Sequence, residues 1–254
     1  SPIEFVVPGT SDDYMDLPHT LLHLKAQIVK TDGSAFTDSD KKVAPINDFL
    51  NAMFSEVQVF LNNKLISYPS HNHPYRSCIE KLLNYDDSAK NSHLQCAMWF
   101  QDTPGHMDST ESANQGFQRR NELTKKSAIF DMMGHLHCDI FNQEKFLIHG
   151  VELRIKLIPA KPSFSLIAED ATVQAKINIL DATLQVKKVD ISPSVKVAHN
   201  RLLLSTTAKY PLTRVQMKSF VIPKDLQSKS IDNLFLGPLP NRIIVGFTNN
   251  DAFN

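Results

Sequence analysis

The segment MMGHLHCDIF, residues 132–141, brings two histidines, a cysteine and an aspartate close together in the chain. Imidazole, thiolate and carboxylate groups are the ligands that transition metals prefer in proteins. Alternate side chains of a β-strand share a face, so His135, His137 and Asp139 would project from the same side of a strand. The spacing therefore opens two alternatives, a metal-dependent enzyme and a strand of a structural protein.

The ligand pattern of cupins, which are jelly-roll metalloenzymes, is the nearest match to this segment. Cupins use a histidine pair of this spacing followed by a glutamate, and Glu144 and Gly150 stand in about the right range. The details differ, because Ile129 occupies a position that needs glycine and Glu144 comes too late. Ile140 also stands where a metallo-hydrolase HxHxDH motif needs its last histidine. We therefore predict no metal site, no cofactor and no catalytic residue, and the three candidates above belong to the alternative, a cupin-like metalloenzyme.

The composition excludes several functional classes. Of the 254 residues, 42% are apolar, which is enough to bury a core. Lys and Arg number 27, as do Asp and Glu, so the formal net charge is zero, whereas a dedicated nucleic-acid binder needs a basic excess. The eight glycines form no phosphate-binding loop, and the three cysteines form no CxxC pair. No apolar run approaches the roughly 18 residues of a membrane-spanning helix.

Alternation with a period of two dominates the chain and predicts β-strands. Residues 21–30 place four apolar side chains on one face, and residues 151–158 do the same. Residues 57–67 indicate a hairpin, whose turn would be formed by Asn62 and Asn63. Further strands are predicted at 93–100, 129–140 and 173–191. The alternation changes phase after Ile179, which predicts a bulge, a bend or two successive strands.

The same alternation predicts which side chains form the core. The residues expected inside are Val57, Leu61, Leu153, Ile155 and Leu157. The residues expected outside are Lys25, Arg154 and Lys156.

Two segments have helical spacing instead. Residues 46–57 place apolar side chains at positions three and four apart, and residues 74–85 follow the same pattern behind Pro74. Cys78 is then expected in the core.

Residues 101–127 are polar and nearly free of aliphatic side chains, which predicts a long loop on the outside of the sandwich. Its charge cluster, formed by Arg119, Arg120, Lys125 and Lys126, is either a solvated surface or a binding patch.

These elements predict a mainly β protein. We expect an antiparallel jelly-roll sandwich with two short helices over residues 1–192. New strand patterns at 212–223 and 241–249 predict the opening strands of an incomplete second jelly roll within residues 193–254.

The chain also resembles a known family. Residues 14–33, 43–67 and 73–85 are similar to the first jelly roll of double-jelly-roll major capsid proteins, more specifically those of Polinton/Maverick virus-like transposons and adintoviruses. The segment GHLHCDIFNQEKFLIHGVELRIKLIP resembles paired strands of that family. Residues 208–223 and 233–254 resemble the opening of its second jelly roll, and most of that roll is missing here.

The resemblance implies a structural role without enzymatic activity. It implies homotrimeric capsomers that tile an icosahedral virion capsid, assembled inside the host cell in the cytoplasm or nucleus. The implied partners are further copies of the chain, neighbouring capsomers and a penton or minor capsid protein. A specific nucleic acid, a membrane span and a cofactor are not implied.

Overall fold

The computed structural model describes residues 1–9, 12–170 and 172–248. The strands are β1 (Ile3–Val7), β2 (Tyr14–Lys30), β3 (Val43–Pro45), β4 (Phe54–Leu61), β5 (Lys64–Leu65), β6 (Phe130–His135), β7 (Leu153–Pro159), β8 (Leu166–Ala168) and β9 (Ala175–Val189). The α-helices are α1 (Phe49–Ala52), α2 (His73–Asn84), α3 (Asp87–Lys90), α4 (Gln115–Thr124), α5 (Pro162–Ser165) and α6 (Pro193–Leu203). Short 3-10 helices are η1 (His93–Ala97), η2 (Lys125–Ser127) and η3 (Asp139–Asn142).

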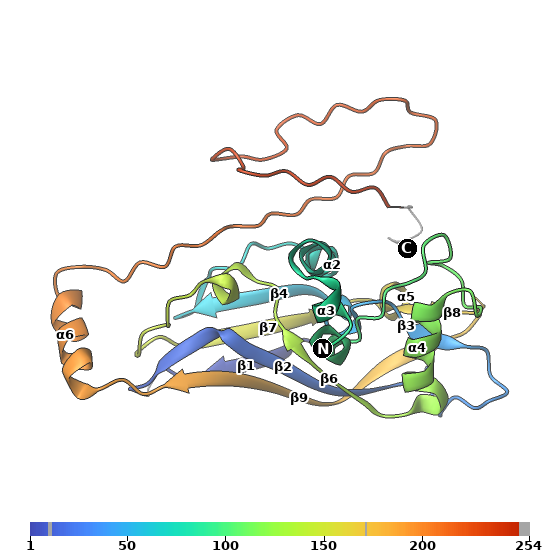
Figure 1. Ribbon diagram of the computed structural model, residues 1–254, viewed down its shortest axis with the longest axis horizontal. Coiled ribbons are helices and arrows are strands. Elements are labelled where there is room, and N and C mark those ends of the chain that lie inside the picture. Colours follow the sequence, from blue (N-terminus) through green and yellow to red (C-terminus); the bar gives the residue numbers. More distant parts are fainter. Residues whose placement is uncertain (10–11, 171, 249–254) are drawn as a thin grey trace. The chain divides into compact units, whose positions relative to one another are not determined.

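The protein is mainly β with antiparallel pairing, as predicted. One sheet has the strand order β1-β7-β4-β5, a second has the order β6-β2-β9, and β3 pairs with β8. Buried side chains of β2 and β6 share one core with those of β4 and β7, which is consistent with a β-sandwich. In Figure 1 the long strands run lengthwise, with α4 at one end and α6 at the other. Jelly-roll connectivity stays a prediction.

The predicted inward faces of the strands are confirmed. In β2 the four alternate residues from Leu22 to Ile28 are at most 1% exposed. The predicted core residues Val57, Leu153, Ile155 and Leu157 are at most 4% exposed, and Leu61 is partly buried against the same core. Lys25 is exposed and Arg154 and Lys156 are partly exposed, as expected.

Two irregularities predicted from sequence are also present. The β4–β5 hairpin turns through Asn62 and Asn63, both with positive φ, as tight hairpin turns require. The phase change in β9 is a bulge within one strand, because the register with β2 shifts between Lys25 and Ala26 and leaves Leu180 unpaired.

The helix predicted at 46–57 is wrong except for one turn, α1. Asp48 precedes α1 with left-handed backbone angles, and from Phe54 the chain joins the sheet as β4. The helical spacing arises because α1 and the start of β4 face the same core, with Phe49, Met53 and Phe54 all buried. Tertiary contacts here override the local pattern. The helix predicted at 74–85 is confirmed as α2, although Cys78 is only partly buried.

The strand predicted at 93–100 is wrong. Residues His93–Ala97 form η1, and Met98 then takes left-handed backbone angles, which turn the chain. Leu94, Ala97 and Trp99 are buried, so the apolar residues do reach the interior, but from a turn of helix rather than a strand.

The prediction of a long outer loop at 101–127 is also wrong in part, because the segment contains α4. Asn114 caps this helix by accepting a hydrogen bond from the Phe117 amide at 3.3 Å. Phe117 and Arg120 are both 0% exposed. The guanidinium of Arg120 donates to the Pro45 carbonyl at 2.7 Å and to Asp102 at 2.6 Å, so a buried arginine in place of aliphatic residues anchors the helix.

The chain divides into two units, residues 1–217 and a second unit that begins at Lys218. The first unit thus includes α6 and extends beyond the predicted boundary at residue 192. The described residues after Val189 contain no strand, so the strands predicted at 212–223 and 241–249 are not formed, and residue 249 lies outside the described residues. Extended segments become strands only when a neighbouring segment completes their hydrogen bonds. Membership of 193–254 in a second jelly roll stays a prediction.

Candidate functional site

The histidine-bearing segment does not form one continuous strand. β6 ends at His135, which is paired with Leu21 of β2, and the chain then leaves the sheet and forms η3 from Asp139. His135 is exposed, whereas His137 is 6% exposed and faces α2. The shared strand face that a chelating pair needs is therefore not formed.

His137 and Asp139 instead join a cluster of ion pairs with α2. His137 Nδ1 lies 2.7 Å from Glu80 Oε2, and Arg76 donates to Asp139 Oδ1 at 2.7 Å and to Glu80 Oε1 at 2.8 Å. Arg76 and Glu80 are four residues apart, so they lie on the same face of α2. The cluster joins α2 to the segment that follows β6.

The charges of this cluster stabilise one another. Burial opposes ionisation of Glu80, but hydrogen bonds from His137 and Arg76 hold the pKa of Glu80 below its usual value. Burial likewise opposes the charge of Arg76, but Glu80 and Asp139 raise its pKa. Both side chains are therefore ionised at neutral pH.

The neighbouring groups are held in their neutral forms. Burial, followed by the charges of His137 and Arg76, lowers the pKa of His73 to about 3. Burial raises the pKa of Cys138 to about 12, so its thiol is a poor nucleophile and a poor metal ligand. Desolvation by the surrounding protein, followed by the charge of His137, also lowers the pKa of His135, although this side chain is exposed.

The ion pairs fasten segments that lie far apart in the sequence. Within the described residues, no group of three or more His, Cys, Asp or Glu side chains could hold a metal ion. Asp139 Oδ1 also accepts from the Val215 amide at 3.2 Å, and the Ser70 hydroxyl donates to the Met217 carbonyl at 3.5 Å. The cluster thus connects α2, η3 and residues 215–217, which follow α6 in the chain.

Sequence reasoning missed a second buried charge cluster beneath α2. Asp48, which is 2% exposed, accepts hydrogen bonds from Ser77 and Lys81, and from the side chain of Asn51 at 3.1 Å. Ser77 and Lys81 are four residues apart on α2, so the helical pattern at 74–85 already placed them on one face. Asp48 has left-handed backbone angles, and its carboxylate lies beneath that face.

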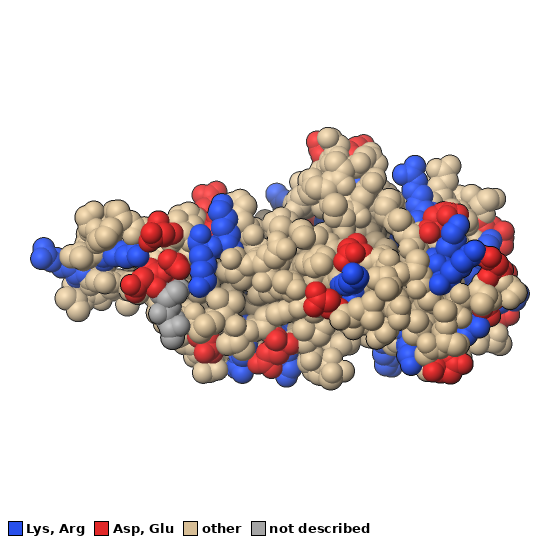
Figure 2. All heavy atoms as spheres, turned by 90° about the horizontal axis from the view of Figure 1, so that it is seen from below, with Lys and Arg blue, Asp and Glu red and all other residues tan. Residues whose placement is uncertain are grey.

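The surfaces that could contact other molecules are an unpaired strand edge and exposed apolar side chains. β9, which runs from Ala175 to Val189, is hydrogen-bonded to β2 and has no strand on its other side among the described residues. In the second unit Val221, Ile243 and Val245 are 64%, 57% and 73% exposed. Figure 2 shows positive and negative side chains interspersed over the visible face, without a large patch of one sign.

Comparisons with known proteins give one distant relative. No family model matches the chain. An uncharacterised protein of Caenorhabditis elegans is 23% identical over 262 aligned residues, which cover 100% of this chain and 60% of the relative. The chain thus spans about three fifths of the length of the curated relative that it matches. Among the described residues, no helix has both the length and the apolar character needed to cross a bilayer.

Proposed function

We propose that the protein is a structural major capsid protein whose trimers form the capsomers of an icosahedral shell. The observation that carries the proposal is the antiparallel β architecture, in which two sheets share one core and one edge of the long strand β9 has no partner strand among the described residues. This architecture supports the family resemblance found along the sequence, whose fold is the double jelly roll.

The physical demands on a shell protein are consistent with these features. A shell subunit needs a stiff body and several contact surfaces, and it needs no catalytic group. Unpaired strand edges and exposed apolar side chains favour association, because they leave backbone hydrogen bonds and apolar area for a neighbour to cover. Closed rings of identical subunits arise when one surface of each copy fits a different surface of the next.

The proposed partners follow from this role. They are two further copies of the chain in a trimer, then neighbouring capsomers and a penton or minor capsid protein. The proposed location is the virion capsid, with assembly inside the host cell. The chain spans 60% of its relative, and a complete second jelly roll is part of the same proposal.

The test is the mass of the particles in solution. The 254-residue chain and a chain extended by the downstream sequence of its gene are compared by light scattering and negative-stain electron microscopy. We expect discrete trimers, and shells at high concentration, for the extended chain, and irregular association for the shorter one. An extended chain that stays monomeric and forms no shells at any concentration would contradict the capsid proposal.

A further inference from the structure

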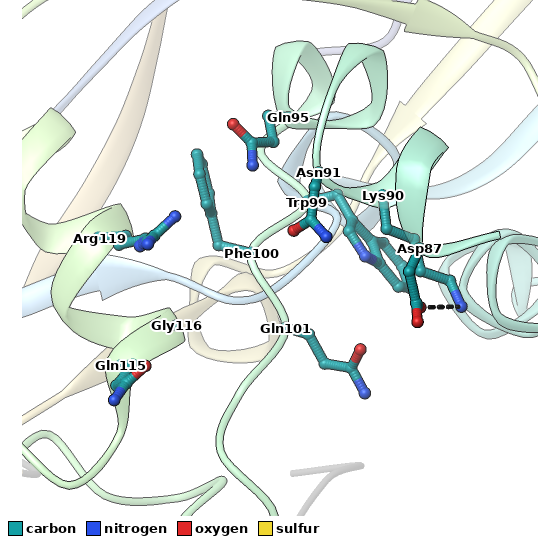
Figure 3. A pocket seen from close by; sticks show the side chains of 10 residues that line it. All are labelled: Asp87, Lys90, Asn91, Gln95, Trp99, Phe100, Gln101, Gln115, Gly116 and Arg119. Atoms are coloured by element: carbon teal, nitrogen blue, oxygen red, sulfur yellow. Dashed lines mark ion pairs between the residues drawn. The ribbon is translucent and has the colours of Figure 1, made fainter. Parts of the chain in front are cut away.

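A polar hollow of about 240 Å³ lies outside the ion-pair clusters, where α3, η1 and the first turn of α4 meet (Figure 3). Four carboxamide side chains line it, from Asn91, Gln95, Gln101 and Gln115. None of these four side chains makes a hydrogen bond within the described part of the chain. Their donors and acceptors are therefore available to a bound molecule.

Two further hydrogen-bond donors of the lining have no acceptor among the described residues. One is Nε1 of Trp99, a side chain that is 2% exposed. In Figure 3 this indole nitrogen lies on the side of the ring toward Asn91 and Gln101. Buried indole N–H groups are usually paired, so an unpaired one in the wall of a hollow indicates a missing acceptor.

The second donor is the backbone N–H of Gly116, in the first turn of α4. The backbone N–H groups of Gln115 and Phe117 donate to the Thr103 hydroxyl and to the Asn114 side chain. The backbone N–H of Gly116 has no acceptor within the described part of the chain. A Cβ atom at this position would overlap the carbonyl group of Gln101, so the backbone approaches closely here. Free N–H groups at a helix N-terminus, together with the helix dipole, attract anions.

The charged side chains of the lining also favour an anion. Lys90 and Arg119 are cationic, and Asp87 is the one acidic residue of the lining. Lys90 lies 3.8 Å from Asp87, but the Asp87 side chain is 94% exposed, so solvent screens this pair. Arg119 makes no ion pair within the described residues, and Figure 3 shows its side chain pointing from α4 toward the Phe100 ring.

We propose that this hollow binds a small oxyanion, a carboxylate or a phosphate group. The Arg119 guanidinium, the Gly116 N–H and the carboxamides would donate to its oxygens, and the Trp99 N–H would donate to the atom that enters deepest. A volume of 240 Å³ is below the ~300–1,000 Å³ of most ligand pockets, so it admits one such group with a small body attached. The site is independent of the capsid proposal and of the His137 cluster.

Trp99 is the single tryptophan of the chain, so its fluorescence reports on the hollow alone. The purified protein is titrated with inorganic phosphate in one arm and with succinate in the other, at constant ionic strength set with potassium chloride. Isothermal calorimetry on the same samples gives the stoichiometry. We expect saturable binding of one ion per chain with a change in Trp99 emission, and the arm that binds more tightly identifies the oxyanion.

Arg119→Gln should weaken binding about tenfold or more, because a charge-assisted hydrogen bond is lost. Arg201→Gln, an exposed arginine of α6, is the matched control and should bind as the wild type does. Circular dichroism of each variant establishes that it is folded. The proposal is overturned if neither ion binds saturably to the folded wild type, or if Arg119→Gln binds as tightly as the control.

Discussion

Buried charge in this protein is concentrated around α2, and it makes stability sensitive to pH. His73 is 5% exposed, and burial together with the charges of His137 and Arg76 lowers its pKa from 6.5 to about 3. Between these two values the unfolded chain binds a proton at this residue and the folded chain does not. The free energy of unfolding therefore falls as pH decreases through this range, and the contribution is fully present only above pH 6.5.

Replacement of His73 should make the free energy of unfolding less dependent on pH. Between neutral pH and pH 5, the wild type should lose about 2 kcal/mol more unfolding free energy than His73→Gln, whose side chain does not titrate. Urea denaturation at both pH values measures the difference. The exposed His106 provides the control, since His106→Gln should follow the wild type. If the unfolding free energies of the wild type and of His73→Gln change equally with pH, His73 is not held neutral in the folded protein.

The phase of β7 is tested by two adjacent substitutions. Ile155 is 0% exposed, and Ile155→Ala should lower the unfolding free energy by about 2–5 kcal/mol through lost burial and the cavity left behind. Lys156 points to the opposite face of β7, and Lys156→Ala should change the unfolding free energy by no more than about 0.5 kcal/mol. Chemical denaturation of both variants measures these changes. An unchanged midpoint for Ile155→Ala would mean that the face assigned to Ile155 is wrong.

Metal content tests the alternative of a cupin-like enzyme at the level of its candidate ligands. We expect purified protein to carry no stoichiometric zinc, iron or manganese by elemental analysis, because His137 is paired with Glu80 and Asp139 with Arg76. About one metal ion per chain that is lost in the His135→Ala variant would support the cupin-like metalloenzyme instead.

At the level of elements, α4 determines how the polar segment 101–127 behaves. Because Phe117 and Arg120 anchor the helix, broad-specificity proteases should cut within 104–113 and spare 115–124 during limited digestion. The cut sites are mapped by mass spectrometry of the fragments. Phe117→Ala should make residues 115–124 susceptible as well. Early cleavage inside α4 of the wild type would contradict the helical anchor.

At the scale of the whole molecule, stability should reside in the first unit. Every buried hydrophobic residue of the described chain belongs to residues 1–217, whereas Leu236, Leu239 and Phe247 in the second unit are at least 80% exposed. A chain of residues 1–217 should keep the denaturation midpoint of the longer one. It should also associate less in light scattering, since exposed apolar area has been removed. A large fall in the midpoint would show that the second unit stabilises the first.

The sequence by itself determined the pairs of inward and outward faces in the long strands. Period-two alternation in β2, β7 and β9 comes directly from the geometry of a strand with one buried face, so the inward positions of Leu22 and Ile155 could be predicted without a structure. The phase change after Ile179 was also visible in the sequence, but only the pairing with β2 identifies it as a bulge. The turn at Asn62 and Asn63 was equally local, because few residue types tolerate positive φ. The helix α2 was also predicted from local spacing, but its buried face carries Ser77 and Lys81, and Leu82 and Leu83 of the apolar pattern are exposed.

Only the tertiary structure decided which residues come together at the candidate sites. Whether residues 46–57 continue as a helix depends on the pairing of β4 with β7, some hundred residues away. The end of β6 at His135, the burial of Arg120 and the ion pair between His137 and Glu80 likewise depend on partners distant in sequence. Local spacing places histidines on a face only if the strand continues, and continuation is decided by the neighbouring strand that completes its hydrogen bonds.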